Sequence, residues 1–226
     1  MPTEPQLPEA GLHDRLVRAG VELVDGEGVQ ALSLREIARR AGVSHGAPRR
    51  HFPTHLDLLS AIAREGFREL AARTAEADAA EADAAGADEE ARSEAGAGEA
   101  GAGEAAGGEC TDPRARIEAL ARGYLDFART HSGMYELMFR HDLLESGRLG
   151  LRDTSLPLFG RLAALVARVR PDADPATAAG ALWANLHGIA QLWRWGSLRL
   201  ATGADDVEPL LAAALRAHLG SAEDGR

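Results

Sequence analysis

The sequence predicts an all-α protein with two helical domains joined by a long acidic segment. Apolar side chains recur at spacings of three and four residues along most of the chain, which is the periodicity of helices with one buried face. Helix-capping residues precede several of these stretches, and no stretch shows the alternating pattern of a strand. The chain has 226 residues, of which 45% are hydrophobic, and it is therefore long enough to build a substantial core.

A first helix is predicted where leucine and alanine recur at helical spacing over residues 12–23. Ser33 and Glu36 have the spacing of a capping box, in which the serine accepts a free backbone N–H and the glutamate reaches back to the cap. A second helix therefore begins at Leu34 and ends at Gly42, and Ser44 caps a third. Two helices joined by a short turn that contains glycine form a helix-turn-helix.

The third helix carries a proline near its start. Pro48 stands at the fourth helical position, where it removes the first intrahelical hydrogen bond. We therefore expect tertiary contacts to hold this helix, with Phe52 as its anchor. A fourth helix follows, capped by Thr54 with Asp57 at its third position.

The net charge of −10 is concentrated in one segment. Residues 75–110 carry 11 acids and one arginine, whereas 1–74 carry ten of each and 111–226 carry fourteen of each. We expect 75–110 to be a disordered linker, although its alanine-rich first half could extend the preceding helix. Its acids either keep the protein soluble, which we favour, or compete with phosphate for a nearby arginine cluster.

That arginine cluster lies in residues 33–52, which hold five arginines against one glutamate. The run SLREIARRAGVSHGAPRRHF over these residues resembles the helix-turn-helix of TetR-type transcriptional regulators, and the resemblance extends over residues 11–71. It implies a homodimer whose third helices enter successive major grooves of a palindromic DNA operator. Most family members are repressors that a small molecule, bound in the second domain, releases from DNA.

Two residues depart from the family pattern. The family usually carries tyrosine where this chain has Arg49 and often lysine where it has His55. Arg49 can keep a phosphate contact, whereas a histidine keeps one only when it is protonated. Arg39 and Arg40, late in the second helix, can equally be solvated surface residues.

The resemblance and helix geometry together assign the DNA contacts. His45, Gly46, Ala47 and Arg49 are expected at the groove-facing start of the third helix, where His45, Arg49 and Ala47 read base edges, and the remaining residues are expected at the DNA backbone. The expected DNA-binding residues are Ser33, Arg35, Ser44, His45, Gly46, Ala47, Arg49, Arg50, His51 and His55.

A second helical domain is predicted over residues 112–219. Asp112-Pro113 and Asp174-Pro175 each combine an N-cap with a proline at the first helical position. The helix that starts at Pro175 is apolar nearly all round, yet it contains too many alanines and polar side chains to favour a membrane. A partner's copy of the last two helices is the simplest cover for it, so we expect a homodimer.

The sequence WANLHG at 183–188 also resembles the W-x-x-x-H-G signature of TetR carboxy-terminal domains called WHG, and this resemblance implies a dimerisation and effector domain. This domain contains most of the aromatic side chains of the protein, and they suit either an apolar effector pocket or an ordinary core. The expected effector-pocket residues are Tyr124, Phe127, Tyr135, Met138, Phe139, Trp183, His187 and Trp193.

Other features bound the function. The chain has one cysteine, Cys110, and its first residues lack the pattern of a signal peptide, so we expect a cytoplasmic protein associated with the nucleoid. Residues 1–10 and 220–226 are expected to be disordered tails. No catalytic motif, metal cluster or cofactor motif is apparent, so we expect no enzyme activity, metal or cofactor. The alternative is a ligand-binding or protein-interaction dimer with a degenerate helix-turn-helix. Pro48, and the absence of the family's tyrosine at position 49, favour this alternative.

Overall fold

The computed structural model describes residues 11–96, 112–145 and 150–220, without the side chains of 82 and 84–96. All regular secondary structure in these residues is helical, which confirms the predicted fold class. The chain divides into two units. The first unit consists of the described residues of Met1–Glu69 and Thr130–Ser155, and the second unit consists of those of Leu70–Arg129 and Leu156–Arg226.

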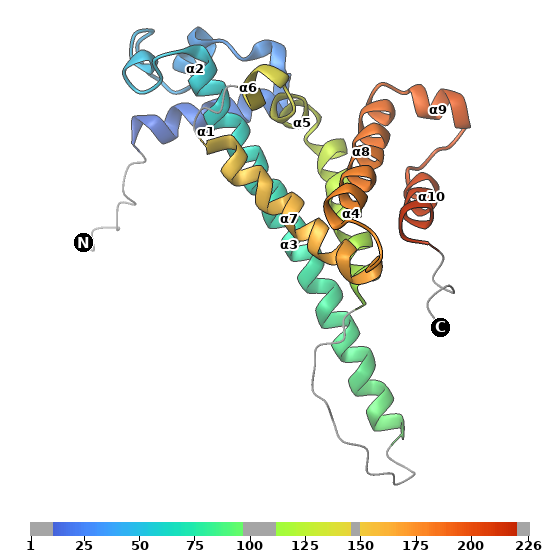
Figure 1. Cartoon of the computed structure of the whole chain (residues 1–226). Helices are drawn as coiled ribbons and strands as arrows, with labels where there is room; N and C mark the ends of the chain where they lie inside the picture. The colour runs from blue at the N-terminus through green and yellow to red at the C-terminus, as the bar shows by residue number, and fades with distance from the viewer. Residues whose placement is uncertain (1–10, 97–111, 146–149, 221–226) are drawn as a thin grey trace, which may run out of the picture. The chain divides into compact units, whose positions relative to one another are not determined.

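The first unit contains the helix-turn-helix elements and two later helices (Figure 1). Its elements are α1 (Leu12–Glu27), η1 (Val29–Ala31), α2 (Leu34–Arg40), η2 (Pro48–Arg50), the start of α3 (His55–Gly96), α5 (Ser132–Met138), α6 (His141–Glu145) and the start of α7 (Leu151–Val169). Its core includes Leu16, Leu23, Ile37, Leu58 and Ile62, all fully buried. Leu16 and Leu23 lie at the helical spacing that predicted the first helix.

Two glycines let the helices of the first unit approach closely. A Cβ atom on Gly66 of α3 would lie 2.6 Å from Met134 Cγ and from Met138 Sδ of α5. A Cβ atom on Gly133 of α5 would collide with the backbone carbonyl oxygen of Val24 in α1. At these two positions the helices of the first unit therefore pack too closely to accommodate an added methyl group.

The local caps form largely as predicted. Ser33 Oγ accepts the Glu36 N–H at 3.2 Å, and Thr54 Oγ1 accepts the Asp57 N–H at 3.1 Å. The second half of the capping box at Ser33 does not form, because the Ser33 N–H donates to the Ala31 carbonyl and the Glu36 carboxylate pairs with Arg39. Gly42 has a positive φ of 67° after α2, as expected for a helix-closing glycine.

Helix α3 extends beyond residue 71, where the first domain was expected to end. It runs from His55 to Gly96, so the alanine-rich half of the expected linker extends this helix, the option that its composition left open. Asp78 in this extension is buried, and its carboxylate accepts two hydrogen bonds from Arg116 of α4 at 2.5 and 2.7 Å. This ion pair lowers the pKa of Asp78. The rest of the expected linker, 97–110, and both expected tails except Gly220 lie outside the described residues.

The second unit consists of the remaining helices. They are the later part of α3, α4 (Pro113–Thr130) up to Arg129, α7 from Leu156, α8 (Pro175–Arg194), α9 (Ser197–Thr202) and α10 (Glu208–Leu219). Both predicted N-caps form, since Asp112 Oδ1 accepts the Arg114 N–H at 2.9 Å and Asp174 Oδ2 accepts the Thr177 N–H at 2.8 Å. Helices α8 and α10 lie side by side (Figure 1).

Helix α8 buries one face and leaves another exposed. Leu182, Leu186 and Ile189 are buried, as their spacing predicted. The opposite face is made of small or apolar residues, among them Ala181, Ala184, Leu192 and Trp195, all exposed. Among the described helices, none has the length and apolar character needed to cross a membrane.

Candidate nucleic-acid interface

The recognition segment, residues 44–52, is not the α-helix that the sequence predicted. It consists of a turn followed by the 3₁₀-helix η2, and most of its backbone hydrogen bonds join residues three apart, such as Ala47 N–H to the Ser44 carbonyl at 3.0 Å. An α-helix would need an N–H from Pro48 to the Ser44 carbonyl, and proline has none. Pro48 is instead buried, and the Phe52 N–H donates to its carbonyl at 2.8 Å.

The segment nevertheless presents most of the predicted DNA-binding residues on the surface. Ala47 is partly exposed and His55 is half-buried, whereas the other eight are exposed. The exposed residues are Ser33, Arg35, Ser44, His45, Gly46, Arg49, Arg50 and His51. The buried side of the segment is therefore formed by Pro48 and Phe52, and its polar side chains are available to a ligand.

The arginines of residues 33–52 fall into two groups. Arg39 donates to Glu36 at 2.9 and 2.5 Å, and Arg40 pairs with both Glu27 and Glu36. These pairings lower the pKa of Glu36 to about 2, chiefly through the hydrogen bond from Arg39. Arg35, Arg49 and Arg50 form no ion pair with another residue in the described part of the chain. The net positive charge that faces solvent therefore comes from these three.

His55 stands at the start of α3 and differs from the other candidates. Burial lowers its pKa, an effect that the hydrogen bond to the Leu32 backbone opposes and the nearby Arg140 reinforces. Its Nε2 atom is buried and has no hydrogen-bond partner among the described residues. Because a histidine with a lowered pKa is neutral at neutral pH, His55 lacks the charge that a phosphate contact would need.

One helix outside the motif also supports it. Arg15 of α1 donates from Nη2 to the Ala41 carbonyl at 2.5 Å, which satisfies a carbonyl at the end of α2. Sequence analysis did not single out Arg15, because an arginine on an amphipathic helix carries no signal for a distant carbonyl partner. The turn between α2 and the recognition segment is thus held by a side chain from α1.

The residues expected in an effector pocket divide between the two units. Tyr135, Met138 and Phe139 belong to the first unit, where Phe139 contacts Phe67 of α3 with ring centroids 5.7 Å apart. Tyr135 and Met138 are fully buried. They belong to a different unit from the others because the boundary between the units falls at residue 130, between these residues and Phe127. A single aromatic cluster of all eight residues is therefore not formed within either unit.

The second unit keeps the other five residues. Tyr124 Oη of α4 lies 2.9 Å from His187 Nδ1 of α8, and the Trp183 ring lies 5.7 Å from the His187 ring. Burial lowers the pKa of His187, so its imidazole is neutral at neutral pH. Phe127 is fully buried beneath the Arg73 guanidinium, and Arg199 lies over Trp193. Of the five, Trp183 is the most exposed, at 39%.

Comparisons with protein families place both parts of the chain. Residues 16–62 match the family described as bacterial regulatory proteins, tetR family. Residues 117–218 match the family described as tetracyclin repressor-like, C-terminal domain. No curated protein matches the chain.

Solved structures share the fold over nearly the whole chain. A protein of unknown function from Rhodococcus sp. RHA1 is 25% identical, with a TM-score of 0.69 over 96% of this chain and 97% of that one. The TetR-family transcriptional regulator PfmR from Thermus thermophilus is 18% identical, with a TM-score of 0.57 over 93% of this chain and 100% of its own. The multidrug binding protein EbrR, complexed with imidazole, is 24% identical, with a TM-score of 0.55 over 96% and 99% of the two chains.

Proposed function

Because the chain belongs to the TetR family of DNA-binding transcriptional regulators, we propose that it is a homodimeric repressor that binds a palindromic operator and is released by a small molecule. The observation that carries the proposal is the set of exposed arginines, Arg35, Arg49 and Arg50, which have no acidic partner among the described residues. Exposed guanidinium groups on a helix-turn-helix suit phosphates and guanine edges.

The recognition segment supplies two kinds of contact. Arg49 is proposed to read a guanine through two hydrogen bonds to N7 and O6, and Ala47 to contact a thymine methyl group. Arg50 and the hydroxyls of Ser33 and Ser44 are proposed to hold phosphates, which set the register of the protein on the duplex. His45 and His51 are exposed beside them. His55 is proposed to support the start of α3 rather than to bind a phosphate.

The proposed dimer uses the exposed faces of α8 and α10. On α8 this face carries Ala181, Ala184 and Gly188, whose small side chains permit a close approach of a second helix. Trp195 at the end of α8 is 65% exposed, and Ala213 is exposed on α10. A symmetric four-helix interface would bury these apolar surfaces in both copies.

The second unit is proposed to bind the effector beside the Tyr124–His187 hydrogen bond. The Trp183–His187 ring contact on α8 joins the two side chains of the W-x-x-x-H-G sequence and supports the proposed WHG-type domain. A neutral imidazole can donate or accept one hydrogen bond without the cost of burying a charge. Bound effector is proposed to change the separation of the two recognition segments, which must match half-sites roughly 34 Å apart.

A mobility-shift titration against the DNA upstream of the protein's own gene tests this function. We expect a specific shift that weakens with salt, and about a tenfold to hundredfold lower affinity for Arg49→Ala, because a bidentate arginine–guanine contact is worth about 1–3 kcal/mol. Arg68→Ala is the matched control, since Arg68 is exposed on α3 and pairs with Glu65. Equal affinity of wild type and Arg49→Ala for the operator would contradict the proposal.

One observation favours a second candidate function. The recognition segment contains a single 3₁₀ turn in place of a recognition α-helix, as a degenerate motif would. The chain would then be a ligand-binding or protein-interaction dimer without a specific operator. In the same titration this candidate requires that the wild-type protein bind every duplex equally weakly.

A further inference from the structure

The recognition segment has little support of its own. Ala47, Arg50 and His51 donate backbone hydrogen bonds only to carbonyls three residues earlier, at 3.0–3.2 Å. Such 3₁₀ bonds have poorer geometry than α-helical ones, and a single 3₁₀ turn is not stable alone. The orientation of Arg49 and Arg50 therefore depends on what holds the two ends of η2.

The C-terminal end of η2 is held through Phe52. The Phe52 N–H donates to the Pro48 carbonyl at 2.8 Å, so Phe52, two residues after Arg50, closes the turn that carries both arginines. The Phe52 side chain is only 2% exposed. Any group that fixes this ring also fixes the backbone from which Arg49 and Arg50 project.

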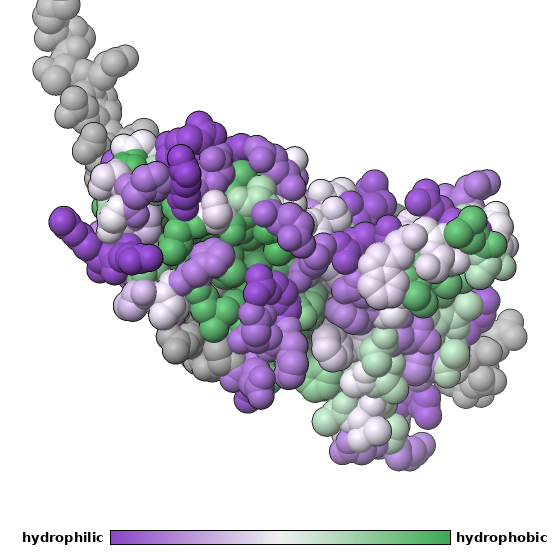
Figure 2. All heavy atoms as spheres, turned by 90° about the horizontal axis from the view of Figure 1, so that it is seen from above, coloured by the Kyte–Doolittle hydropathy of each residue, from purple (hydrophilic) through white to green (hydrophobic). Residues whose placement is uncertain are grey.

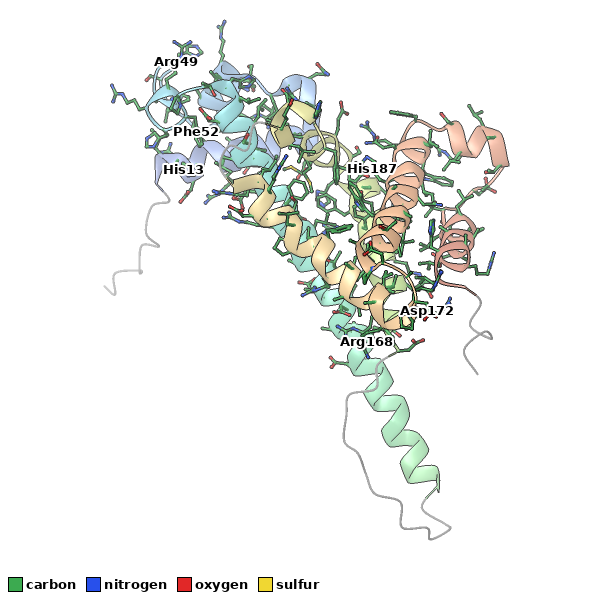
Figure 3. All side chains as sticks on the ribbon, viewed as in Figure 1. His13, Arg49, Phe52, Arg168, Asp172 and His187 are labelled. Atoms are coloured by element: carbon green, nitrogen blue, oxygen red, sulfur yellow. The ribbon has the colours of Figure 1, made fainter. Side chains whose placement is uncertain are left out.

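His13 of α1 packs against that ring. The His13 and Phe52 ring centroids are 4.8 Å apart, with an angle of 30° between the planes. His13 Nδ1 lies 2.9 Å from Asp14 Oδ1, which restricts rotation of the imidazole. In Figure 3, His13 lies beside Phe52, and Arg49 lies beyond Phe52, farther from His13.

We propose that His13 is a positioning residue for operator recognition, which stacks on Phe52 and so holds the recognition segment in the conformation that presents Arg49 and Arg50. Its role differs from a phosphate contact, because one face of its ring is covered by Phe52 and its Nδ1 faces a carboxylate. Together with Arg15, which holds the turn before the segment, His13 makes α1 the support of the reading surface. This inference rests on the proposed operator-binding function.

The test measures operator affinity and non-specific DNA affinity for His13→Ala and His13→Phe. His13→Ala should lower operator affinity about tenfold, because a roughly threefold loss for each lost aromatic contact applies to both subunits. Non-specific affinity and its salt dependence should stay unchanged, since all the arginines remain. His13→Phe should restore most of the operator affinity, because it retains an aromatic ring against Phe52.

His141→Ala is the matched control. It removes an exposed imidazole from α6 of the same unit and should change neither affinity. Unchanged operator affinity in His13→Ala would overturn the proposal. So would an equal loss of specific and non-specific affinity that His13→Phe does not restore, which would make His13 a direct phosphate contact. If the wild type itself shows no operator preference, the proposed function fails instead, and the two failures are thereby distinguished.

Discussion

The two units differ in how completely each covers its own apolar surface. In the described residues, the large hydrophobic side chains that remain exposed are Leu156, Trp183, Leu192, Trp195 and Leu200, and all of them belong to the second unit. Leu200 on α9 is 89% exposed, and Figure 2 shows hydrophobic surface over α9 at the right of the view. Within the described residues, the exposed large hydrophobic side chains therefore gather in the second unit, to which we assign the proposed dimer interface.

Several glycines inside helices differ between the two units in a similar way, although Gly26 in α1 also has open space. Gly66 and Gly133 in the first unit leave no room for a methyl group. Gly160, Gly180 and Gly188 in the second unit have open space where a Cβ atom would stand. A surface that reads DNA needs fixed side-chain positions, while a surface that pairs with a second copy needs small residues that stay accessible until assembly. The difference therefore follows from the two proposed tasks.

The largest expected effect comes from disrupting the proposed dimer interface of the second unit. Ala184→Glu places a carboxylate on the exposed face of α8, next to its own copy in the proposed dimer. We expect a monomer and a loss of operator affinity of about a hundredfold or more, because two linked reading heads gain roughly 10²–10⁴ over one. Sedimentation velocity measures the assembly, and a mobility-shift titration measures the affinity.

Ala164→Glu is the control for that variant, since Ala164 is exposed on α7 of the same unit. It should leave both assembly and DNA affinity unchanged. A dimeric Ala184→Glu protein with normal affinity would show that this face of α8 is not the interface.

A smaller effect comes from filling glycines in the two units. Gly133→Ala should lower the free energy of unfolding by about 1–3 kcal/mol, because the added methyl group collides with the Val24 carbonyl. Gly160→Ala should raise it by about 0.5–1 kcal/mol, because it replaces glycine with alanine inside a helix with open space around it. Guanidinium unfolding of the two variants tests the contrast, and changes of the same sign would contradict it.

The smallest effect concerns the partly exposed carboxylate of Glu36. Glu36 has its pKa lowered from an ordinary 4.5 to about 2, chiefly by the hydrogen bond from Arg39. A lowered carboxyl pKa adds stability that is present above the ordinary pKa and is lost as the pH falls through the folded value. Between about pH 5 and 2, Glu36→Gln should therefore lose less stability than the wild type.

Asp78 in the second unit offers a comparison for this loss of stability at low pH. Asp78 is buried and its pKa is also lowered, chiefly by the hydrogen bond from Arg116, so Asp78→Asn should likewise reduce the loss of stability with falling pH. Carboxylate titrations followed by NMR and thermal unfolding at each pH measure both effects. A loss of stability at low pH that is the same in both variants as in the wild type would contradict the assignment.

Local chemistry made much of the fold predictable. The caps at Ser33, Thr54, Asp112 and Asp174 depend on side chains within three residues of the backbone that they satisfy, and all four form. The exposure of Arg49 and of most other proposed DNA contacts also follows from the helix-turn-helix pattern. Such features need no knowledge of distant contacts.

Features that depend on distant contacts were not predictable in the same way. The sequence showed that Pro48 removes one hydrogen bond from the third helix. That this segment forms a 3₁₀ turn instead depends on the burial of Pro48 and of Phe52, which the sequence does not show. Glu36 pairs with Arg39 and not with the backbone N–H of Ser33, and Tyr135 and Phe139 pack in the first unit. Sequence spacing alone does not predict which of several possible partners a side chain contacts.

Footprinting on genomic fragments selected by the purified protein tests the central claim most directly. The account predicts two protected half-sites related by a dyad, about 10 base pairs apart or at a multiple of that spacing, with guanines in each whose protection disappears in Arg49→Ala. A single unpaired site, or uniform protection of every duplex, would contradict it.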